Sequence, residues 1–364
     1  MSASESVVGL AQGKVMLFGE YSVLEGGSAI LSPSPQVAEA RYTPLQSLDA
    51  GWSSRLEMSQ VDGYFPVYLV DGYGVGQSVI LRAAASSTEW HRVGDPLHFA
   101  ELALITMTPP SGLYEINTQQ FGKELNGEWR KMGIGSSGAT TAALLDLFHK
   151  QLCQEKVALH ELATPVQRLR VAIDIHTRAQ GGIGSGADLA CSVYGQLIRF
   201  KRATEHQANP LVYPILQTLP QTYCIWRGGS ASTTSLVKQV QAQSLRDPRG
   251  YQLCIDQLIS AENCAFQLFD QPQISLKDWS QAISQGAEAI SSLSRWAKAP
   301  LWTELHSKWS EIVKPFGGVI KPTGAGGDDL SILSAVDEER LISSLEALKD
   351  FSKQEDEILY SFPL

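Results

Sequence analysis

The chain has 364 residues, enough for two domains of ordinary size, and its 43% apolar and 18% charged residues are typical of a globular protein. A formal net charge of −9 argues against a general nucleic-acid-binding protein, which would carry a basic surface. No stretch reaches the ~18 apolar residues of a membrane span, and residues 1–5 do not resemble the start of a signal peptide, so we expect a cytoplasmic protein. The five cysteines form no CxxC pair, which favours reduced thiols over a zinc site.

The first half of the chain reads as strands followed by helices. Alternation and β-branched content predict strands at 15–18, 36–42, 65–70 and 78–82. Apolar residues at helical spacing predict helices from Ala139 to Leu152, over 166–178, and from about Asp188. A polar stretch with three prolines, 206–220, is the predicted junction between two domains at 1–205 and 206–364.

Strands and helices alternate again after this junction. The pattern predicts strands at 222–226, 318–321 and 330–336, and helices at 232–243, 252–268, 277–296, 303–313 and after Asp337. This order indicates an α+β fold with helices on one face of a sheet.

The chain carries three glycine-rich segments, which begin at Gly13, Lys131 and Lys321. The second, with Gly133–Gly138, precedes the helix that begins near Ala139. It matches GxGxxG formally, but the residues before it make a poor buried strand, so a dinucleotide-binding unit is disfavoured. Unpaired N–H groups and the positive end of the helix dipole would still face a phosphate placed there. Ser136 and Ser137 could cap the helix, bind Mg²⁺, or do both, and a plain capped helix is the alternative.

Two charged residues and a third glycine-rich segment complete the candidates. Lys14 follows Gly13 at the start of an apolar strand, where an ammonium is costly without an anionic partner, although a surface lysine at a strand end is the alternative. Asp188 begins an apolar helix, either as an N-cap or as a base facing an acceptor hydroxyl. The segment Thr323–Gly327 lies between two predicted strands, as a backing for phosphates or as a tight hairpin.

Taken together, these segments resemble the motifs of the GHMP kinases, a superfamily of small-molecule ATP kinases. Within it they are most similar to the phosphomevalonate kinases, whose GEYxVL, GxGSS, AQGxxGSGxD, WxGxxAST and KPTGAGGD patterns match Gly19–Leu24, Gly133–Ser137, Ala179–Asp188, Trp226–Thr233 and Lys321–Asp328. The resemblance spans nearly the whole chain. It implies a two-domain GHMP kinase fold, with a ribosomal-S5-like N-terminal domain and a ferredoxin-like C-terminal domain.

The resemblance also implies roles for individual residues. Lys14 and Asp188 would be catalytic, and Ser136 or Ser137 would bind Mg²⁺. The ATP phosphates would lie against Gly133, Gly135, Ser136, Ser137, Gly138, Ala139 and Thr140. The acceptor would lie near Glu20, Tyr21, Gln180, Ser185, Gly186 and Ser232. The third glycine loop would contribute Gly324, Ala325, Gly326 and Gly327.

Three positions depart from the pattern. Thr177 stands where mevalonate kinases carry a magnesium-binding Glu, Asp329 stands where a smaller residue is usual, and Ala187 stands where an aromatic residue is frequent. The cation that binds the acceptor phosphate is left open among Arg178, Arg227, His176 and Lys131.

The implied activity is ATP-dependent phosphorylation of 5-phosphomevalonate to 5-diphosphomevalonate, in the mevalonate route to isoprenoids. Alternatives are mevalonate kinase or another GHMP kinase, a diphosphomevalonate decarboxylase, and a non-catalytic ligand sensor. We expect a small-molecule substrate, no nucleic-acid or membrane partner, and a monomer or homodimer.

Overall fold

The computed structural model describes residues 6–44, 66–71, 78–82, 98–107, 112–125, 128–154, 161–180, 184–204, 209–229, 233–355 and 357–364. The chain forms two compact units: unit 1 contains 1–13, 36–121 and 135–195, and unit 2 contains 14–35, 122–134 and 196–364. This division is not two consecutive segments, because residues 14–35 and 122–134 cluster with the C-terminal half. The predicted domain boundary at 205/206 stays a prediction.

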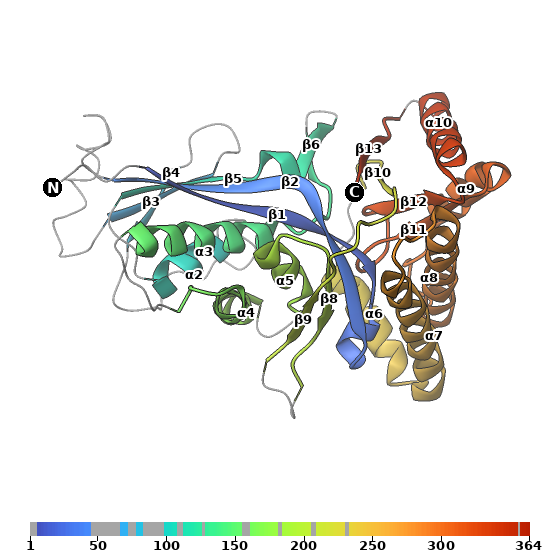
Figure 1. Ribbon diagram of the computed structural model, residues 1–364, viewed down its shortest axis with the longest axis horizontal. Helices are drawn as coiled ribbons and strands as arrows, with labels where there is room; N and C mark the ends of the chain where they lie inside the picture. Colours follow the sequence, from blue (N-terminus) through green and yellow to red (C-terminus); the bar gives the residue numbers. More distant parts are fainter. Residues whose placement is uncertain are drawn as a thin grey trace. The chain divides into compact units, whose positions relative to one another are not determined.

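Unit 1 is a sheet with helices on one face. Its strands follow the order β4-β3-β5-β2, with β3 parallel to β5 and the other pairs antiparallel. The helices α2, α3 and α4 contact one another below this sheet in Figure 1. The elements are β1 (Val7–Phe18) and β2 (Ser28–Pro44), which both continue into unit 2, β3 (Pro66–Asp71), β4 (Ser78–Arg82), α2 (His98–Met107), β5 (Gly112–Asn117), η4 (Gln119–Phe121), α3 (Ser136–Gln154), α4 (Pro165–Gln180) and α5 (Ala187–Tyr194).

The helix α3 is the central helix of unit 1. Most of its residues from Gly138 to Phe148 are buried, and Phe148 packs edge-on against Tyr114 of β5 with ring centroids 6.2 Å apart. Strand β1 approaches α3 so closely at Gly9 that a Cβ there would lie 2.0 Å from the Ala143 carbonyl oxygen. This packing holds α3 against β1 at Ala143 and Leu147.

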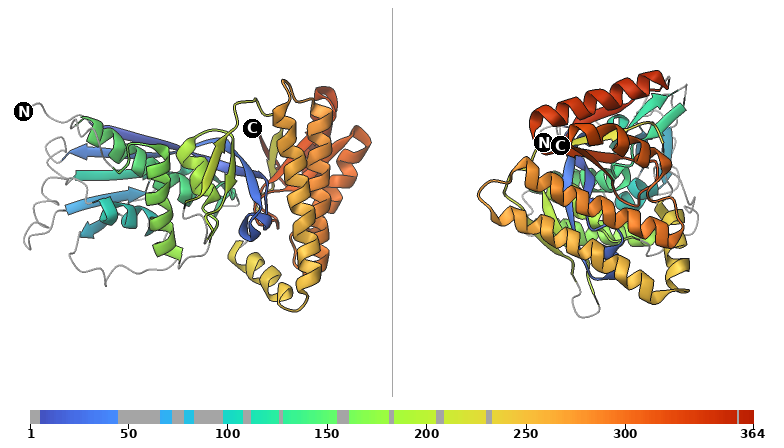
Figure 2. Two further views of the ribbon diagram at one scale, coloured as in Figure 1. Left: turned by 60° about the horizontal axis from the view of Figure 1, so that its bottom comes forward. Right: turned by 90° about the vertical axis from the view of Figure 1, so that its right-hand side faces the viewer.

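Unit 2 contains a four-stranded antiparallel sheet, in the order β11-β12-β10-β13, packed against helices. The helices α8 and α9 contact β11, and α8 and α10 contact β12. Figure 2 shows α7 and α8 running side by side. The elements are η1 (Ser22–Glu25), β6 (Gly122–Leu125), β7 (Glu128–Lys131), β8 (Ile198–Lys201), β9 (Leu211–Pro214), β10 (Tyr223–Trp226), α6 (Thr233–Ser244), α7 (Pro248–Gln267), η5 (Leu268–Asp270), α8 (Leu276–Ala297), α9 (Glu304–Val313), η6 (Lys314–Phe316), β11 (Gly318–Pro322), β12 (Ser331–Ala335), α10 (Glu338–Gln354) and β13 (Tyr360–Pro363).

Two further features of the described residues bear on function. Strand β7 precedes the second glycine loop but pairs only with β6 as an antiparallel ribbon, which agrees with the weak case for a dinucleotide-binding βαβ unit. No helix in the described part of the chain is long and apolar enough to cross a bilayer.

Candidate active site

The strand β1 carries Lys14 to the third glycine loop within unit 2. The Lys14 backbone N–H donates to the Ile134 carbonyl at 2.8 Å, which ties β1 to the start of the second glycine loop. The Lys14 Nζ lies 3.8 Å from the point that a Cβ on Gly324 would occupy. This half-buried ammonium makes no hydrogen bond or ion pair with any described residue. It is therefore available to an anion at the third loop.

The third glycine loop joins the antiparallel strands β11 and β12 as a hairpin, and a role of its glycines as a backing for phosphates stays a prediction. The Thr323 N–H and hydroxyl both donate to the Leu330 carbonyl, at 3.0 and 3.1 Å, and close the loop at its base. Gly324, Gly326 and Gly327 have φ of 64°, 81° and 77°, a region that favours glycine. The loop backbone is thus shaped by glycines rather than by side chains.

A buried ion pair connects the base of this loop to the first motif, Gly19–Leu24. The Lys321 Nζ on β11 donates to the Glu20 carboxylate, and the two side chains are 0% and 1% exposed. The same ammonium donates to the Pro322 carbonyl at 3.1 Å. Burial raises the pKa of Glu20 above its usual value, although the Lys321 charge lowers it. The Glu20 carboxylate is therefore directed at a partner inside the protein, and the expectation that Glu20 lies near the acceptor stays a prediction.

In unit 1, the second glycine loop leads directly into α3. The helix begins at Ser136, and the Gly135 carbonyl accepts the first helical hydrogen bond from Ala139 N–H at 3.0 Å. The cap position is therefore Gly135, and the expectation that Ser136 or Ser137 caps the helix is wrong. Both serines are half-buried, and their hydroxyls have no hydrogen-bond partner among the described residues.

The carboxylate of Asp188 lies against this same turn. A Cβ built on Gly138 would lie 3.5 Å from Asp188 Oδ2. Helix α5 begins at Ala187, and its N-cap is Gly186, with φ of 77°. The N-cap alternative for Asp188 is therefore wrong, and the half-buried carboxylate makes no hydrogen bond with the described residues. The structure thus brings the base candidate to the first turn of α3.

A buried histidine supports that turn from behind. The His176 Nε2 on α4 lies 3.0 Å from Thr141 Oγ1, and the Thr141 hydroxyl donates to the Ser137 carbonyl at 3.2 Å. The Phe99 ring packs on the imidazole, with centroids 4.3 Å apart. Burial lowers the pKa of His176, while the Asp188 charge raises it. His176 is thus poorly suited to bind an acceptor phosphate.

The remaining candidate cations for the acceptor phosphate differ in their ion-pair partners. Arg178 pairs with Asp174 at 2.5 Å on the exposed side of α4, and Arg227 pairs with Glu357. Lys131 is exposed and makes no ion pair with the described residues. Of the four candidates, Lys131 is therefore the exposed cation that has no ion-pair partner in the described part of the chain.

The remaining predicted residues are placed as follows. Ser185 is half-buried and its hydroxyl accepts from the Ala187 N–H at 3.2 Å. Tyr21 is buried and donates its hydroxyl to the Ala325 carbonyl. Gln180 is the last residue of α4, and its side chain lies outside the described structure, as does Ser232. Ser136 and Asp188 belong to unit 1 and Lys14 to unit 2, so a single pocket that contains all three stays a prediction.

The described residues could hold a magnesium ion only together with waters and substrate phosphates. No group of three His, Cys, Asp or Glu residues in the described part of the chain could hold a metal alone. Mg²⁺ in phosphoryl-transfer sites is commonly held by one or two protein oxygens, waters and the substrate phosphates. The Ser136 and Ser137 hydroxyls and the Asp188 carboxylate meet that requirement at the first turn of α3.

Three residues in these surroundings have little or no signal in the sequence pattern. Lys321 is an isolated lysine in the apolar strand Gly318–Pro322, which is the same signal that marks Lys14. Asp329 departs from the motif pattern, and its carboxylate lies against the second loop, with Cγ 3.1 Å from a Cβ built on Gly133. The contact of His176 with Thr141 joins residues 35 apart and has no sequence signal.

Comparisons with known proteins agree on the fold. No protein family model matches the chain. The Listeria innocua protein Lin0012 has a TM-score of 0.77 at 17% identity, covering 99% of both chains. The Streptococcus pneumoniae phosphomevalonate kinase, in complex with phosphomevalonate and AMPPNP, has a TM-score of 0.70 at 15% identity, covering 98% of this chain and 100% of that one. The L. major mevalonate kinase, in complex with R-mevalonate, has a TM-score of 0.67 at 16% identity, covering 99% and 96%.

The chain therefore has the two-domain GHMP kinase fold, as the sequence motifs predicted. In sequence it is similar to phosphomevalonate kinases. That of Streptomyces sp. strain CL190 is 23% identical over 91% of this chain and 90% of its own length, and that of Gibberella zeae is 25% identical over 90% and 88%.

Proposed function

We propose that this protein is a phosphomevalonate kinase, which transfers the γ-phosphoryl group of ATP to 5-phosphomevalonate. A phosphate oxygen of the acceptor forms the new P–O bond, and the bond between the β- and γ-phosphates breaks. The products are 5-diphosphomevalonate and ADP.

The observation that carries this proposal is the Lys14 ammonium beside the third glycine loop, which makes no hydrogen bond or ion pair with the described residues. The Glu20 charge interacts with it but forms no ion pair with it, and a bound anion would offset the cost of holding a half-buried ammonium there. The Ser136 and Ser137 hydroxyls and the Asp188 carboxylate form a second set of polar groups, which make no hydrogen bond with the described residues and lie at a helix N-terminus suited to phosphate. The sequence similarity to phosphomevalonate kinases supports 5-phosphomevalonate as the acceptor.

Each residue then has a role that follows from its chemistry. The N–H groups of the second loop and of the first turn of α3 would hold the ATP phosphates. Lys14 would neutralise the charge on the phosphoryl group in transfer, and Asp188 would orient the acceptor oxygen. Ser136 or Ser137 would help to hold Mg²⁺, which would supply charge neutralisation at the phosphates. An acceptor phosphate is already anionic, so positioning and charge neutralisation outweigh proton removal.

Mevalonate kinase is the second candidate, because the L. major mevalonate kinase is nearly as similar in fold as the phosphomevalonate kinase, with TM-scores of 0.67 and 0.70. Coupled detection of ADP with mevalonate, 5-phosphomevalonate and homoserine separates the two. The proposal predicts that, of these three acceptors, only 5-phosphomevalonate gives ADP release. Release with mevalonate alone supports the second candidate, and no release with any acceptor contradicts both.

A further inference from the structure

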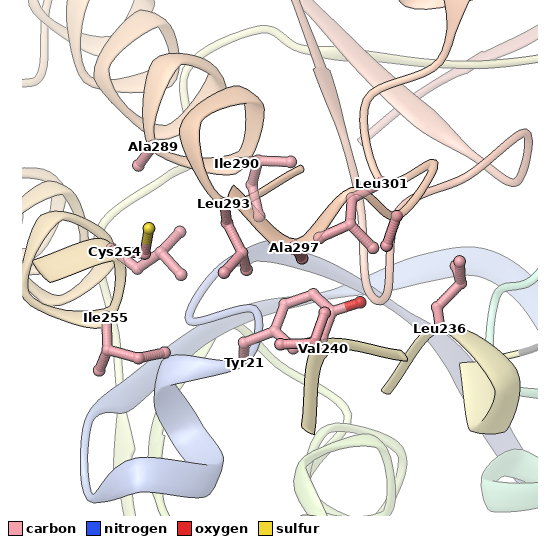
Figure 3. Packing of buried hydrophobic residues seen from close by; sticks show 12 residues of the cluster. Tyr21, Leu236, Val240, Cys254, Ile255, Ala289, Ile290, Leu293, Ala297 and Leu301 are labelled. Carbon is pink, nitrogen blue, oxygen red and sulfur yellow. The ribbon is translucent and has the colours of Figure 1, made fainter. Parts of the chain in front are cut away.

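The side chain of Tyr21 reaches the third glycine loop from inside unit 2. Its hydroxyl donates to the Ala325 carbonyl at 2.8 Å, across 304 residues of sequence. Its ring belongs to a buried cluster whose other members come mainly from α6, α7 and α8, among them Val240, Ile255 and Leu293 (Figure 3). Burial and the neighbouring Glu20 charge raise the pKa of Tyr21, so the hydroxyl stays a donor at neutral pH.

The backbone of Tyr21 is held in an unfavourable conformation. Its φ of 59° lies in the left-handed region, which residues with bulky side chains rarely adopt. Such strain persists only where the surroundings over-determine the conformation, and it is concentrated at functional sites. Here the ring cluster and the hydrogen bond to Ala325 supply that constraint.

The residue before it makes a second, independent contact with the same hairpin. Glu20 pairs with Lys321, which stands at the base of the loop and also binds the Pro322 carbonyl. Adjacent residues of the first motif therefore hold the loop at two points, one at its base and one at Ala325. Gly324, between these points, is where the Lys14 ammonium approaches.

We infer that Glu20 and Tyr21 are positioning residues, which clamp the third glycine loop at the distance from Lys14 that phosphoryl transfer requires. They do not recognise the acceptor: the Glu20 side chain is 1% exposed and Tyr21 is 5% exposed, so neither presents a surface to a ligand. The expected effect on kcat rests on the proposed function. The expected effect on the stability of the third glycine loop rests on the loop contacts alone.

Tyr21→Phe tests the clamp, because it removes one hydroxyl and keeps the ring. Hydrogen–deuterium exchange of the peptide that covers residues 321–330, without ligands, should become about three- to tenfold faster, as expected for the loss of one hydrogen bond. Tyr251→Phe is the matched control: its hydroxyl binds Glu25 Oε1 at 3.0 Å, also in unit 2, and the loop peptide should not change. Unchanged exchange in Tyr21→Phe overturns the inference whether or not the protein is a kinase.

Steady-state kinetics with ATP and 5-phosphomevalonate give the second readout. Tyr21→Phe should lower kcat by about tenfold or more, because small misplacements at a reacting centre are costly, while the KM for 5-phosphomevalonate stays within about twofold. Glu20→Gln should show the same pattern. A tenfold rise in that KM with kcat unchanged would mean that Tyr21 recognises the acceptor, and it overturns the inference. If wild-type protein turns over no acceptor, the proposed function fails, and the exchange experiment still decides the clamp.

Discussion

Replacing Lys321 by Met should destabilise the protein in a manner that depends on pH. The substitution keeps the length of the side chain but leaves the Glu20 carboxylate buried without a cation. The carboxylate can escape only by binding a proton. At pH 7 this costs about 1.4 kcal/mol for each unit above the usual pKa of about 4.5, or about 3.4 kcal/mol. Loss of the hydrogen bond to the Pro322 carbonyl adds about 1 kcal/mol.

The sign of the pH dependence follows from proton binding. In the variant, folded Glu20 keeps its proton to a higher pH than unfolded Glu20, so the folded state binds more protons above pH 4.5. The loss of stability should therefore grow as the pH rises, from about 2 kcal/mol at pH 5 to about 4 kcal/mol at pH 7.

Urea unfolding at a series of pH values, followed by tryptophan fluorescence, measures this difference. Trp279 reports on the region, because its ring lies 5.8 Å from that of Phe18 beside the pair. Lys308→Met, at an exposed pair on α9, is the control and should cost less than about 1 kcal/mol. The double variant Glu20→Gln/Lys321→Met should lose the pH dependence. An equal loss at pH 5 and pH 7 in Lys321→Met, or a loss below about 1 kcal/mol at pH 7, would refute the reasoning.

Three further predictions concern other residues. Burial lowers the pKa of His306 to about 4. The free energy of unfolding of the wild type should therefore fall by up to about 3 kcal/mol between pH 6.5 and pH 4. A His306→Gln variant whose stability falls as steeply with pH would contradict this. Asp329→Asn removes a charge beside Gly133 and should tighten ATP binding by about threefold in calorimetry, whereas weaker binding would show that the carboxylate helps to hold the nucleotide or its metal. Gly286→Ala, within α8, should destabilise rather than stabilise, because the new Cβ would lie 2.9 Å from Lys321 Cε; a higher melting temperature would refute that steric argument.

Much of the fold was accessible from the sequence because its elements are amphipathic and long. The helices at 166–178 and 277–296 and the strands at 78–82 and 318–321 lie where periodicity predicted them. The helix α2 and the strands β5, β8 and β13 were not predicted. The strands among them are short segments stabilised by sheet partners distant in sequence, such as Tyr223 with Pro363, and local pattern carries no record of such pairing.

The candidate site likewise has parts that the sequence predicts and parts that it does not. Glycines and hydroxyls marked the second loop, because backbone geometry restricts which residues can form it. The burial of Glu20 could not be predicted, since its partner Lys321 is 301 residues away. The N-cap positions differ by one or two residues from the prediction, because Gly135 and Gly186, rather than Ser136 or Ser137 and Asp188, cap their helices.

We expect the Lys14 ammonium to stabilise the phosphoryl group during its transfer. The direct measurement is kcat for ADP formation from ATP and 5-phosphomevalonate by Lys14→Met, with Lys308→Met as the control. We expect kcat to fall by about 100-fold or more, the scale seen when a charge-stabilising group is removed, with the KM for ATP within about threefold. A kcat within a few-fold of wild type would contradict it.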